Sequence, residues 1–202
     1  MKRRIVNALA KGLAELGFRS RVNAVLTRQC AGVSYKIPLT GGLGDENLQL
    51  SEPWMTETLR RALPQCSGVF VDVGVNLGQT LIKLKCLEPE RNYLGFEPNP
   101  ACVSYVNRLI AANDYRGARL IPAGLFDANT VLELELYGGE VNSAASLVEG
   151  FRPAKTVPAN SDSDSVLRAH KQFVPVLKYA SSEDSTLRDQ LVLLRSMWKE
   201  PS

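Results

Sequence analysis

The sequence predicts a doubly wound α/β fold with a mostly parallel sheet, and three observations lead to it. The largely apolar run of residues 69–73 is followed at once by a glycine turn. Apolar residues then recur at helical spacing over residues 79–86. A second apolar run, residues 93–97, ends on an acid. A strand, a glycine turn, a helix and a second strand with a terminal carboxylate form one half of a Rossmann-like sheet.

The next elements extend this sheet. Residues 100–113 carry apolar side chains at helical spacing and are predicted to form the second crossover helix. Residues 119–123 are predicted to form the third parallel strand. Before the first strand, Ser51 can cap a helix that starts near Pro53. Trp54 is expected to anchor that helix in the core.

Other segments show strand and helix patterns outside this unit. Residues 33–37 alternate like a short strand. Residues 131–137 have a strict period of two, which favours a half-exposed antiparallel strand with Glu133 and Glu135 on its wet face over acid–base work by these two acids. Residues 173–179 are predicted to form an edge strand because they contain Pro175.

A helix is predicted near the C-terminus. Ser181 or Ser182 would cap it, and the residues on its apolar stripe would be Leu187, Leu191, Leu194 and Trp198. The segment before it, residues 161–165, alternates Ser and Asp and is predicted to be a solvated loop rather than a metal-binding acid pair.

Composition limits the classes of function. A chain of 202 residues with 45% apolar content suits one well-buried domain, and a net charge of +3 is too small to indicate a nucleic-acid partner. The four cysteines lack C-x-x-C spacing, which favours reduced thiols and a cytoplasmic location. The single histidine, His170, rules out a His-rich metal site. No apolar run reaches the ~20 residues of a membrane span.

The N-terminal segment is basic. Residues 3–17 carry apolar side chains at helical spacing and are predicted to form a basic amphipathic helix. A helix that packs on the domain is the favoured interpretation. A surface-seeking or targeting helix is the alternative.

The charges around the glycine turn indicate which nucleotide it would hold. A dinucleotide site has the pattern G-x-G-x-x-G, but Val75 stands between Gly74 and Gly78 where the middle glycine is expected. The carboxylate of Asp72 repels a phosphate and suits a ligand with an ammonium and a sulfonium. Glu97 is placed to accept hydrogen bonds from two ribose hydroxyls. These residues favour S-adenosylmethionine over a nicotinamide dinucleotide.

The same residues carry a resemblance to a known family. Asp-Val-Gly-Val-Asn-Leu-Gly at residues 72–78 and Gly-Phe-Glu-Pro-Asn-Pro at residues 95–100 resemble the FkbM-type family of S-adenosylmethionine-dependent methyltransferases. The similarity extends over roughly two thirds of the chain by eye. Further similar segments are residues 36–44, 50–55, 120–127, 143–146 and 151–153.

The resemblance implies a class I methyltransferase fold and methyl transfer to a hydroxyl oxygen of a small molecule or a glycan. The cofactor-binding residues that it implies are Asp72, Gly74, Asn76, Gly78, Glu97 and Gly124. The glycine turn and Asp72 would hold the methionine part, Glu97 the ribose, and the backbone around Gly124 the adenine. Asp127 is a weaker candidate for the adenine, as are Glu52 and Trp54 for a segment that closes over the cofactor. The resemblance identifies no catalytic residue. His170 is a conceivable general base.

On this interpretation the chain has three parts. Residues 1–30 would be a basic helical segment, residues 31–160 the S-adenosylmethionine-binding core, and residues 161–202 a polar loop, an edge strand and a C-terminal helix. The family has a later strand with a Lys-x-Asp-x-Glu-Gly stretch beside the first strand, and the nearest segment here, residues 176–182, lacks both acids. The sheet is therefore expected to be incomplete in its C-terminal half, with an open edge at the first strand.

Three explanations of the missing half stay open: a truncated product, a homodimer or partner chain that completes the sheet, or a short form whose final helix covers the edge. Two rival functions also remain. One is a non-catalytic module that holds S-adenosylmethionine, or nothing, and acts through a partner at the open edge. The other is a nicotinamide-dependent oxidoreductase, against which Val75 and Asp72 both argue.

Overall fold

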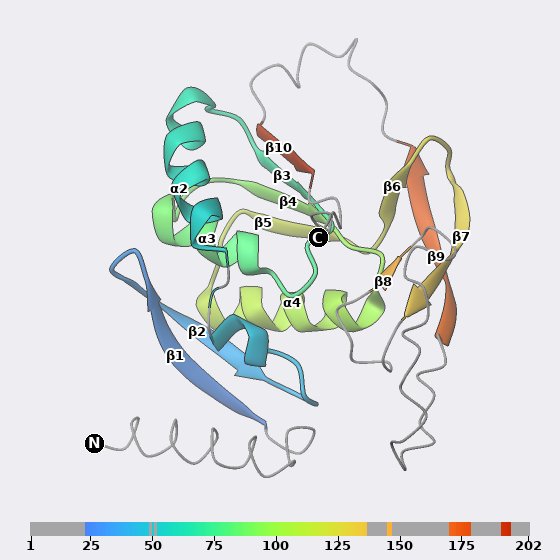
Figure 1. The fold of residues 1–202 in the computed structure, drawn as a ribbon, viewed down its shortest axis with the longest axis horizontal. Coiled ribbons are helices and arrows are strands. Elements are labelled where there is room, and N and C mark those ends of the chain that lie inside the picture. The colour runs from blue at the N-terminus through green and yellow to red at the C-terminus, as the bar shows by residue number, and fades with distance from the viewer. Residues whose placement is uncertain are drawn as a thin grey trace, which may run out of the picture.

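The predicted strand–helix–strand unit lies in a parallel sheet of four strands (Figure 1). In the sheet, β10 (Leu191–Leu194) pairs with β3 (Phe70–Val73), β3 with β4 (Tyr93–Phe96), and β4 with β5 (Ala118–Ile121), all in parallel. This is a computed structural model, and it describes residues 23–48, 50, 52–136, 145–146, 170–178 and 191–194. The sequence analysis predicted β3, β4 and β5 to within a few residues of these bounds.

Two helices connect these strands. After β3 the chain forms α3 (Gln79–Leu87), and after β4 it forms α4 (Pro100–Asn113). Both connections step across the sheet in the same direction, so right-handed crossovers place the two helices on one face. Side chains from both helices belong to one core cluster with β3 and β4. The structure therefore confirms a mixed α/β fold, whereas the doubly wound arrangement with helices on both faces stays a prediction.

The helix before the sheet differs from its prediction in two respects. It is α2 (Pro53–Ala62), continued by the 3-10 helix η3 (Leu63–Gln65). Its N-cap residue is Glu52, in the left-handed conformation, whereas Ser51 lies outside the described residues. Trp54 is 59% exposed and does not anchor the core, a role that Met55 and Leu59 perform instead. No helix in the described part of the chain is long and apolar enough to cross a membrane.

A β-hairpin packs against the helices. β1 (Ala24–Cys30) and β2 (Val33–Leu39) are joined by Ala31 and Gly32, both with positive φ, as a two-residue hairpin turn requires. β2 contacts α4, to which Asn113 ties it with two hydrogen bonds to the backbone of Lys36. The segment of residues 1–30 was predicted to be helical, and this is wrong for residues 24–30. The predicted helix of residues 3–17 lies outside the described residues.

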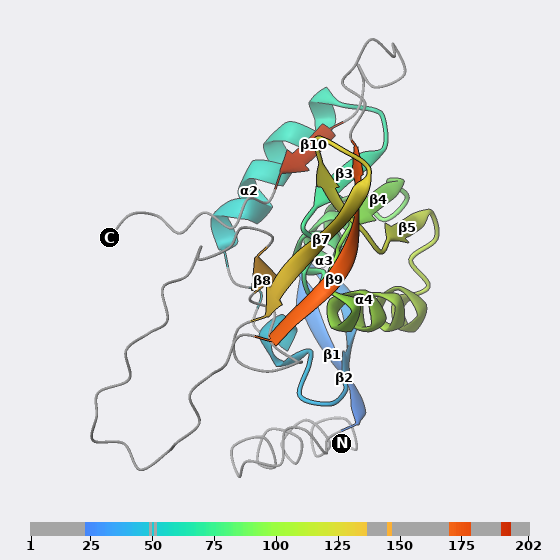
Figure 2. The ribbon, with the colours of Figure 1, turned by 90° about the vertical axis from the view of Figure 1, so that its right-hand side faces the viewer.

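A second, mixed sheet stands beside the parallel one. Its strand order is β6-β9-β7-β8, and Figure 2 shows β7 and β9 side by side. The strands are β6 (Gly124–Phe126), β7 (Thr130–Leu136), β8 (Ala145–Ser146) and β9 (His170–Lys178). The antiparallel pairing of β7 with β9 agrees with the alternation of its sequence.

β9 is an interior strand, and the prediction of an edge strand is wrong. It pairs with β7 on one side and with β6 on the other. Pro175 is compatible with this position because β6 begins to pair only at Val176, one residue further on.

The C-terminal segment also differs from its prediction. Leu191 and Leu194 were expected on the stripe of a helix, but they lie in β10, which pairs with β3 along its whole length. The expected open edge at β3 is therefore wrong, because β3 has a parallel neighbour on both sides. A short strand covers the edge that the sequence assigned to a helix or to a partner chain.

Candidate functional site

The loop between β3 and α3, residues 74–78, is the centre of the predicted site and is called the glycine loop below. Gly74 and Gly78 have φ values of 82° and 77°. At Gly78 a Cβ atom would also come within 2.8 Å of Leu109 Cδ2. The backbone N–H of Gly74 donates to Phe96 O at 2.9 Å, which fixes the loop on the end of β4. Glycine is thus required at Gly78 both by backbone conformation and by space.

Glu97 joins the glycine loop to the start of α4. Its Oε2 accepts a hydrogen bond from the backbone N–H of Asn76 at 2.7 Å, and its Oε1 accepts one from the N–H of Asn99 at 2.8 Å. The side chain of Asn99 caps α4 by accepting from the N–H of Ala101. Glu97 is only 5% exposed. Its carboxylate therefore caps backbone amides that follow the ends of two adjacent strands.

Asp72 lies at the same end of the sheet, on β3. It is fully buried, and its Oδ2 accepts a hydrogen bond from the Tyr93 hydroxyl at 2.7 Å. The register pairs Asp72 with Gly95, and a Cβ atom at Gly95 would lie 2.6 Å from Val75 Cγ2 and 2.9 Å from Tyr93 Cε1. The absence of a side chain at Gly95 thus makes room for the Tyr93 ring beside Asp72.

Five of the six predicted cofactor residues lie in β3, in the glycine loop or directly after β4. They are Asp72, Gly74, Asn76, Gly78 and Glu97. The sixth, Gly124, is the first residue of β6 and pairs with Val176 of β9, so it belongs to the second sheet. Asp127 follows β6 and is exposed. His170, the conceivable general base, is the first residue of β9.

The two remaining weak candidates lie at the start of α2. The Glu52 carboxylate is 3.8 Å from Nζ of Lys83, a buried lysine of α3. Trp54 follows in the first turn of α2 with most of its surface exposed.

Sequence patterns did not identify Tyr93 and Asn99, although both contact the site. The Asn99-Pro100 dipeptide is a recognisable signal, because Asn is a favoured N-cap and Pro is favoured at the first helical position. Tyr93 gives no such signal. Its contact with Asp72 depends on the register of two strands that are about twenty residues apart in the sequence.

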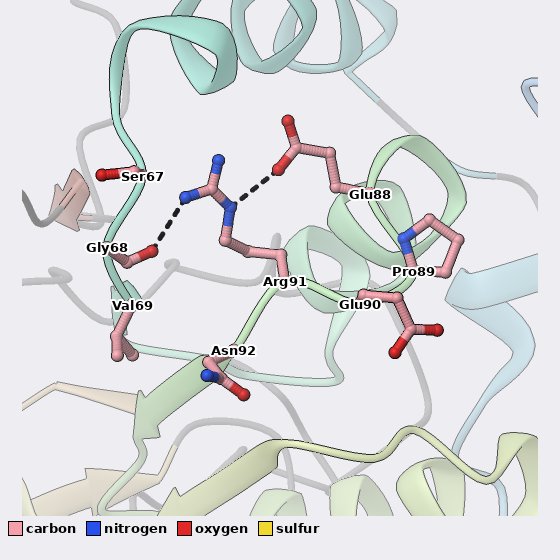
Figure 3. A pocket seen from close by; sticks show the side chains of 8 residues that line it. All are labelled: Ser67, Gly68, Val69, Glu88, Pro89, Glu90, Arg91 and Asn92. Atoms are coloured by element: carbon pink, nitrogen blue, oxygen red, sulfur yellow. Dashed lines mark hydrogen bonds and ion pairs between the residues drawn. The ribbon is translucent and has the colours of Figure 1, made fainter.

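A hollow of about 460 Å³ lies at the opposite end of the sheet (Figure 3). Its walls are residues 67–69, before β3, and residues 88–92, before β4. The Arg91 guanidinium is held there by Glu88 at 2.7 Å and by the Gly68 carbonyl at 2.9 Å. Ligands of open parallel sheets bind at the carboxyl ends of the strands, whereas this hollow is at the amino ends. It is therefore not the predicted cofactor site.

The paired acids of β7 have a structural partner. Nζ of Lys171, on β9, lies 2.6 Å from Oε1 of Glu133 and 3.9 Å from Oε1 of Glu135. Glu135 is nearly buried, although both acids were expected on a wet face. Within the described residues no group of three or more His, Cys, Asp or Glu side chains is arranged to hold a metal ion. Asp162 and Asp164 lie outside those residues.

Comparisons with known protein families, with curated proteins and with solved structures found no match to this chain.

Proposed function

We propose that this protein is an S-adenosylmethionine-dependent methyltransferase that methylates a hydroxyl oxygen of a small molecule or a glycan. The observation that carries the proposal is the contact between the Glu97 carboxylate and the Asn76 amide at 2.7 Å. It joins the acid at the end of one parallel strand to the glycine loop at the end of the next. Ligands of open α/β sheets bind at this kind of position.

The choice of S-adenosylmethionine depends on charge. Two carboxylates, Asp72 and Glu97, lie at the loop, and both are largely buried. Negative charges in a region of low dielectric oppose a pyrophosphate and favour a ligand with an ammonium and a sulfonium. The Val75 side chain is fully buried, so it does not itself cover the outer surface of the loop. The argument against a dinucleotide therefore rests on the two acids more than on the missing glycine.

The proposed reaction moves a methyl group from sulfur to oxygen. In this step the carbon–sulfur bond of the sulfonium would break as the carbon–oxygen bond forms, the acceptor hydroxyl would pass its proton to water, and S-adenosylhomocysteine would leave. Alignment of donor and acceptor and exclusion of water supply most of the catalysis in such a step. The residues assigned here hold the donor: Glu97 binds the ribose, and Asp72 with the glycine loop binds the methionine part.

Calorimetric titration with S-adenosylhomocysteine tests the proposal. We expect the wild-type protein to bind it and Glu97→Gln to bind it roughly ten- to a hundredfold more weakly, as loss of a charge-assisted hydrogen bond implies. Glu57→Gln is the matched control, because it removes one negative charge from an exposed ion pair with Arg60 and Arg61 on α2. Asp72→Asn keeps an acceptor for Tyr93 and tests the second charge.

Two other outcomes would contradict the proposal. Binding of NAD⁺ without binding of S-adenosylhomocysteine would indicate the oxidoreductase alternative. A folded wild-type protein that binds neither ligand would leave Glu97 as a cap of backbone amides and would indicate a non-catalytic module. Circular dichroism of each variant separates loss of binding from loss of the fold.

A further inference from the structure

Asn47 is a buried polar residue outside the strand–helix–strand unit. It lies in the 3-10 helix η2 (Asp45–Leu48), which follows β2, and its side chain is 0% exposed. An amide is rarely buried this completely, and without hydrogen bonds its burial is unfavourable. Its hydrogen bonds therefore indicate why it lies there.

The side chain of Asn47 reaches the glycine loop. Its Nδ2 donates to the carbonyl oxygen of Leu77 at 2.6 Å and to the Tyr105 hydroxyl at 3.2 Å. Leu77 lies between Asn76 and Gly78, two of the loop residues already assigned to the cofactor. Asn47 thus holds the backbone of the loop from a segment 30 residues upstream.

The local backbone is shaped to allow this contact. Gly44, just before η2, has a φ of 102°, and a Cβ atom there would lie 2.9 Å from the Tyr105 hydroxyl and would clash with the Pro38 carbonyl. Only glycine lets η2 approach α4 this closely. The Tyr35 hydroxyl, on β2, donates to the backbone carbonyl of Asn47 at 3.3 Å.

The orientation of the amide follows from its neighbours. If Nδ2 and Oδ1 were exchanged, two oxygens would face each other at Leu77. Among the described residues no donor contacts the buried Oδ1. A buried acceptor without a partner is unfavourable by about 1–3 kcal/mol, so Asn47 is not the side chain that stability alone would select. The Nδ2 group, which donates to the Leu77 carbonyl, is the part of the side chain that makes the stabilising contact.

We propose that Asn47 is a positioning residue for the glycine loop: it fixes the Leu77 carbonyl and thereby sets the adjoining backbone of Asn76 and Gly78 for the cofactor. The inference rests on the proposed function and deepens it. It assigns a role at the site to the segment between the hairpin and α2, which the motif residues alone do not include.

The test compares Asn47→Ala with Asn113→Ala. Asn113 is the matched control because it is also an asparagine, and it ties β2 to α4 through the backbone of Lys36 without touching the glycine loop. Three quantities are measured for each full-length variant: affinity for S-adenosylhomocysteine, thermal stability, and amide hydrogen exchange of residues 74–78 without ligand. Asn47→Asp is the second variant, because it keeps the shape and places an acceptor against Leu77.

We expect both Asn47 variants to lose about tenfold in affinity and to speed exchange in the loop about tenfold, as loss of one strong hydrogen bond implies. Asn113→Ala should lower stability while affinity and loop exchange stay at the wild-type level. The proposal is overturned if Asn47→Ala and Asn113→Ala both weaken binding only in proportion to their loss of stability. It is also overturned if the Asn47 variants leave exchange in the loop unchanged, or if the Asn47 variants do not fold. If the wild-type protein binds no S-adenosylhomocysteine, the proposed function fails, and loop exchange alone decides the role of Asn47.

Discussion

At the scale of residues, a cluster of thiols and phenols lies between the hairpin and the helices. Burial raises the pKa of Cys86 to about 12, and the neighbouring Cys30 acts in the same direction. Burial likewise raises the pKa of Tyr35 to about 12 and that of Tyr115 further still. The folded protein therefore keeps protons on these groups at pH values where the unfolded chain has lost them.

The shifts predict a loss of stability in alkali. Below about pH 8.5 the groups are protonated in both states, so their contribution to stability is complete. From the unfolded-state pKa of each group, 9.0 for Cys86 and 10.0 for Tyr35 and Tyr115, up to about pH 12, the unfolded state binds fewer protons, and each shifted group should lower the free energy of unfolding by about 1.4 kcal/mol per pH unit. The hydroxyl of Tyr115 is buried, and no hydrogen-bond partner contacts it in the described part of the chain. Tyr115→Phe should therefore leave stability at pH 7 unchanged or raise it, by up to about 1–3 kcal/mol, and should flatten the decline above pH 10.

Urea unfolding at a series of pH values from 7 to about 11 measures both effects. Tyr35→Phe is the comparison, because the Tyr35 hydroxyl donates to the Asn47 carbonyl at 3.3 Å. That variant should flatten the alkaline decline as well, but it should lose about 1 kcal/mol at pH 7. A clear loss of stability at pH 7 in Tyr115→Phe would mean that its hydroxyl has a partner, and the expectation would be wrong.

At the scale of elements, α3 shows what a helix pattern leaves out. Apolar residues at helical spacing predict one buried side, but every residue from Gln79 to Cys86 is buried. The apolar side chains of α3 share a core cluster with β3 and β4, and α2 and β2 also contact the helix. Neither of these contacts can be seen within the helix sequence. The bounds of α4 were predictable because its signals are local: Asn99 and Pro100 start it, and Asp114 ends it in the left-handed conformation.

Burial of α3 gives Lys85 a structural role. Its ammonium donates to the carbonyls of Pro89, Arg91 and Arg116, at 2.8, 2.8 and 3.0 Å. All three of its protons are thus used, and the end of α3 is tied to the turns before β4 and β5.

Lys85→Met should lower the free energy of unfolding by about 2–3 kcal/mol, since hydrogen bonds from a charged donor are lost. Lys36→Met, at an exposed position on β2, should change it by less than about 0.5 kcal/mol in the same urea titration. Equal effects of the two substitutions would contradict this role.

At the scale of the whole molecule, the sequence predicted the unit from β3 to β5 and the residues of the glycine loop because those signals lie within one short span. It did not predict which strands pair with distant partners. β10 joins β3 across about 120 residues, and Leu191 and Leu194 fit a helical stripe as well as a strand. β9 likewise was taken for an edge strand because it contains Pro175, and its neighbour β6 has only three residues, which give no clear strand pattern. Local pattern cannot decide such cases, since non-local pairing and burial decide them.

The position of β10 leads to a prediction for the molecule as a whole. Adjacent N–H groups of a strand point to opposite sides, and β10 has only β3 as its neighbour in the described sheet (Figure 1). Of Val192→Pro and Leu193→Pro, one therefore removes a donor that pairs with β3 and the other removes an outward-facing one. The substitution that removes the donor to β3 should lower the free energy of unfolding by about 1–3 kcal/mol. By freeing the β3 edge, it should also promote self-association. Ser196→Pro, two residues after Leu194 in the sequence, is the control. Urea unfolding and light scattering after size-exclusion chromatography measure both effects. If both strand prolines behave like the control, β10 does not cover β3, and an open edge for a partner chain becomes the better account of this sheet.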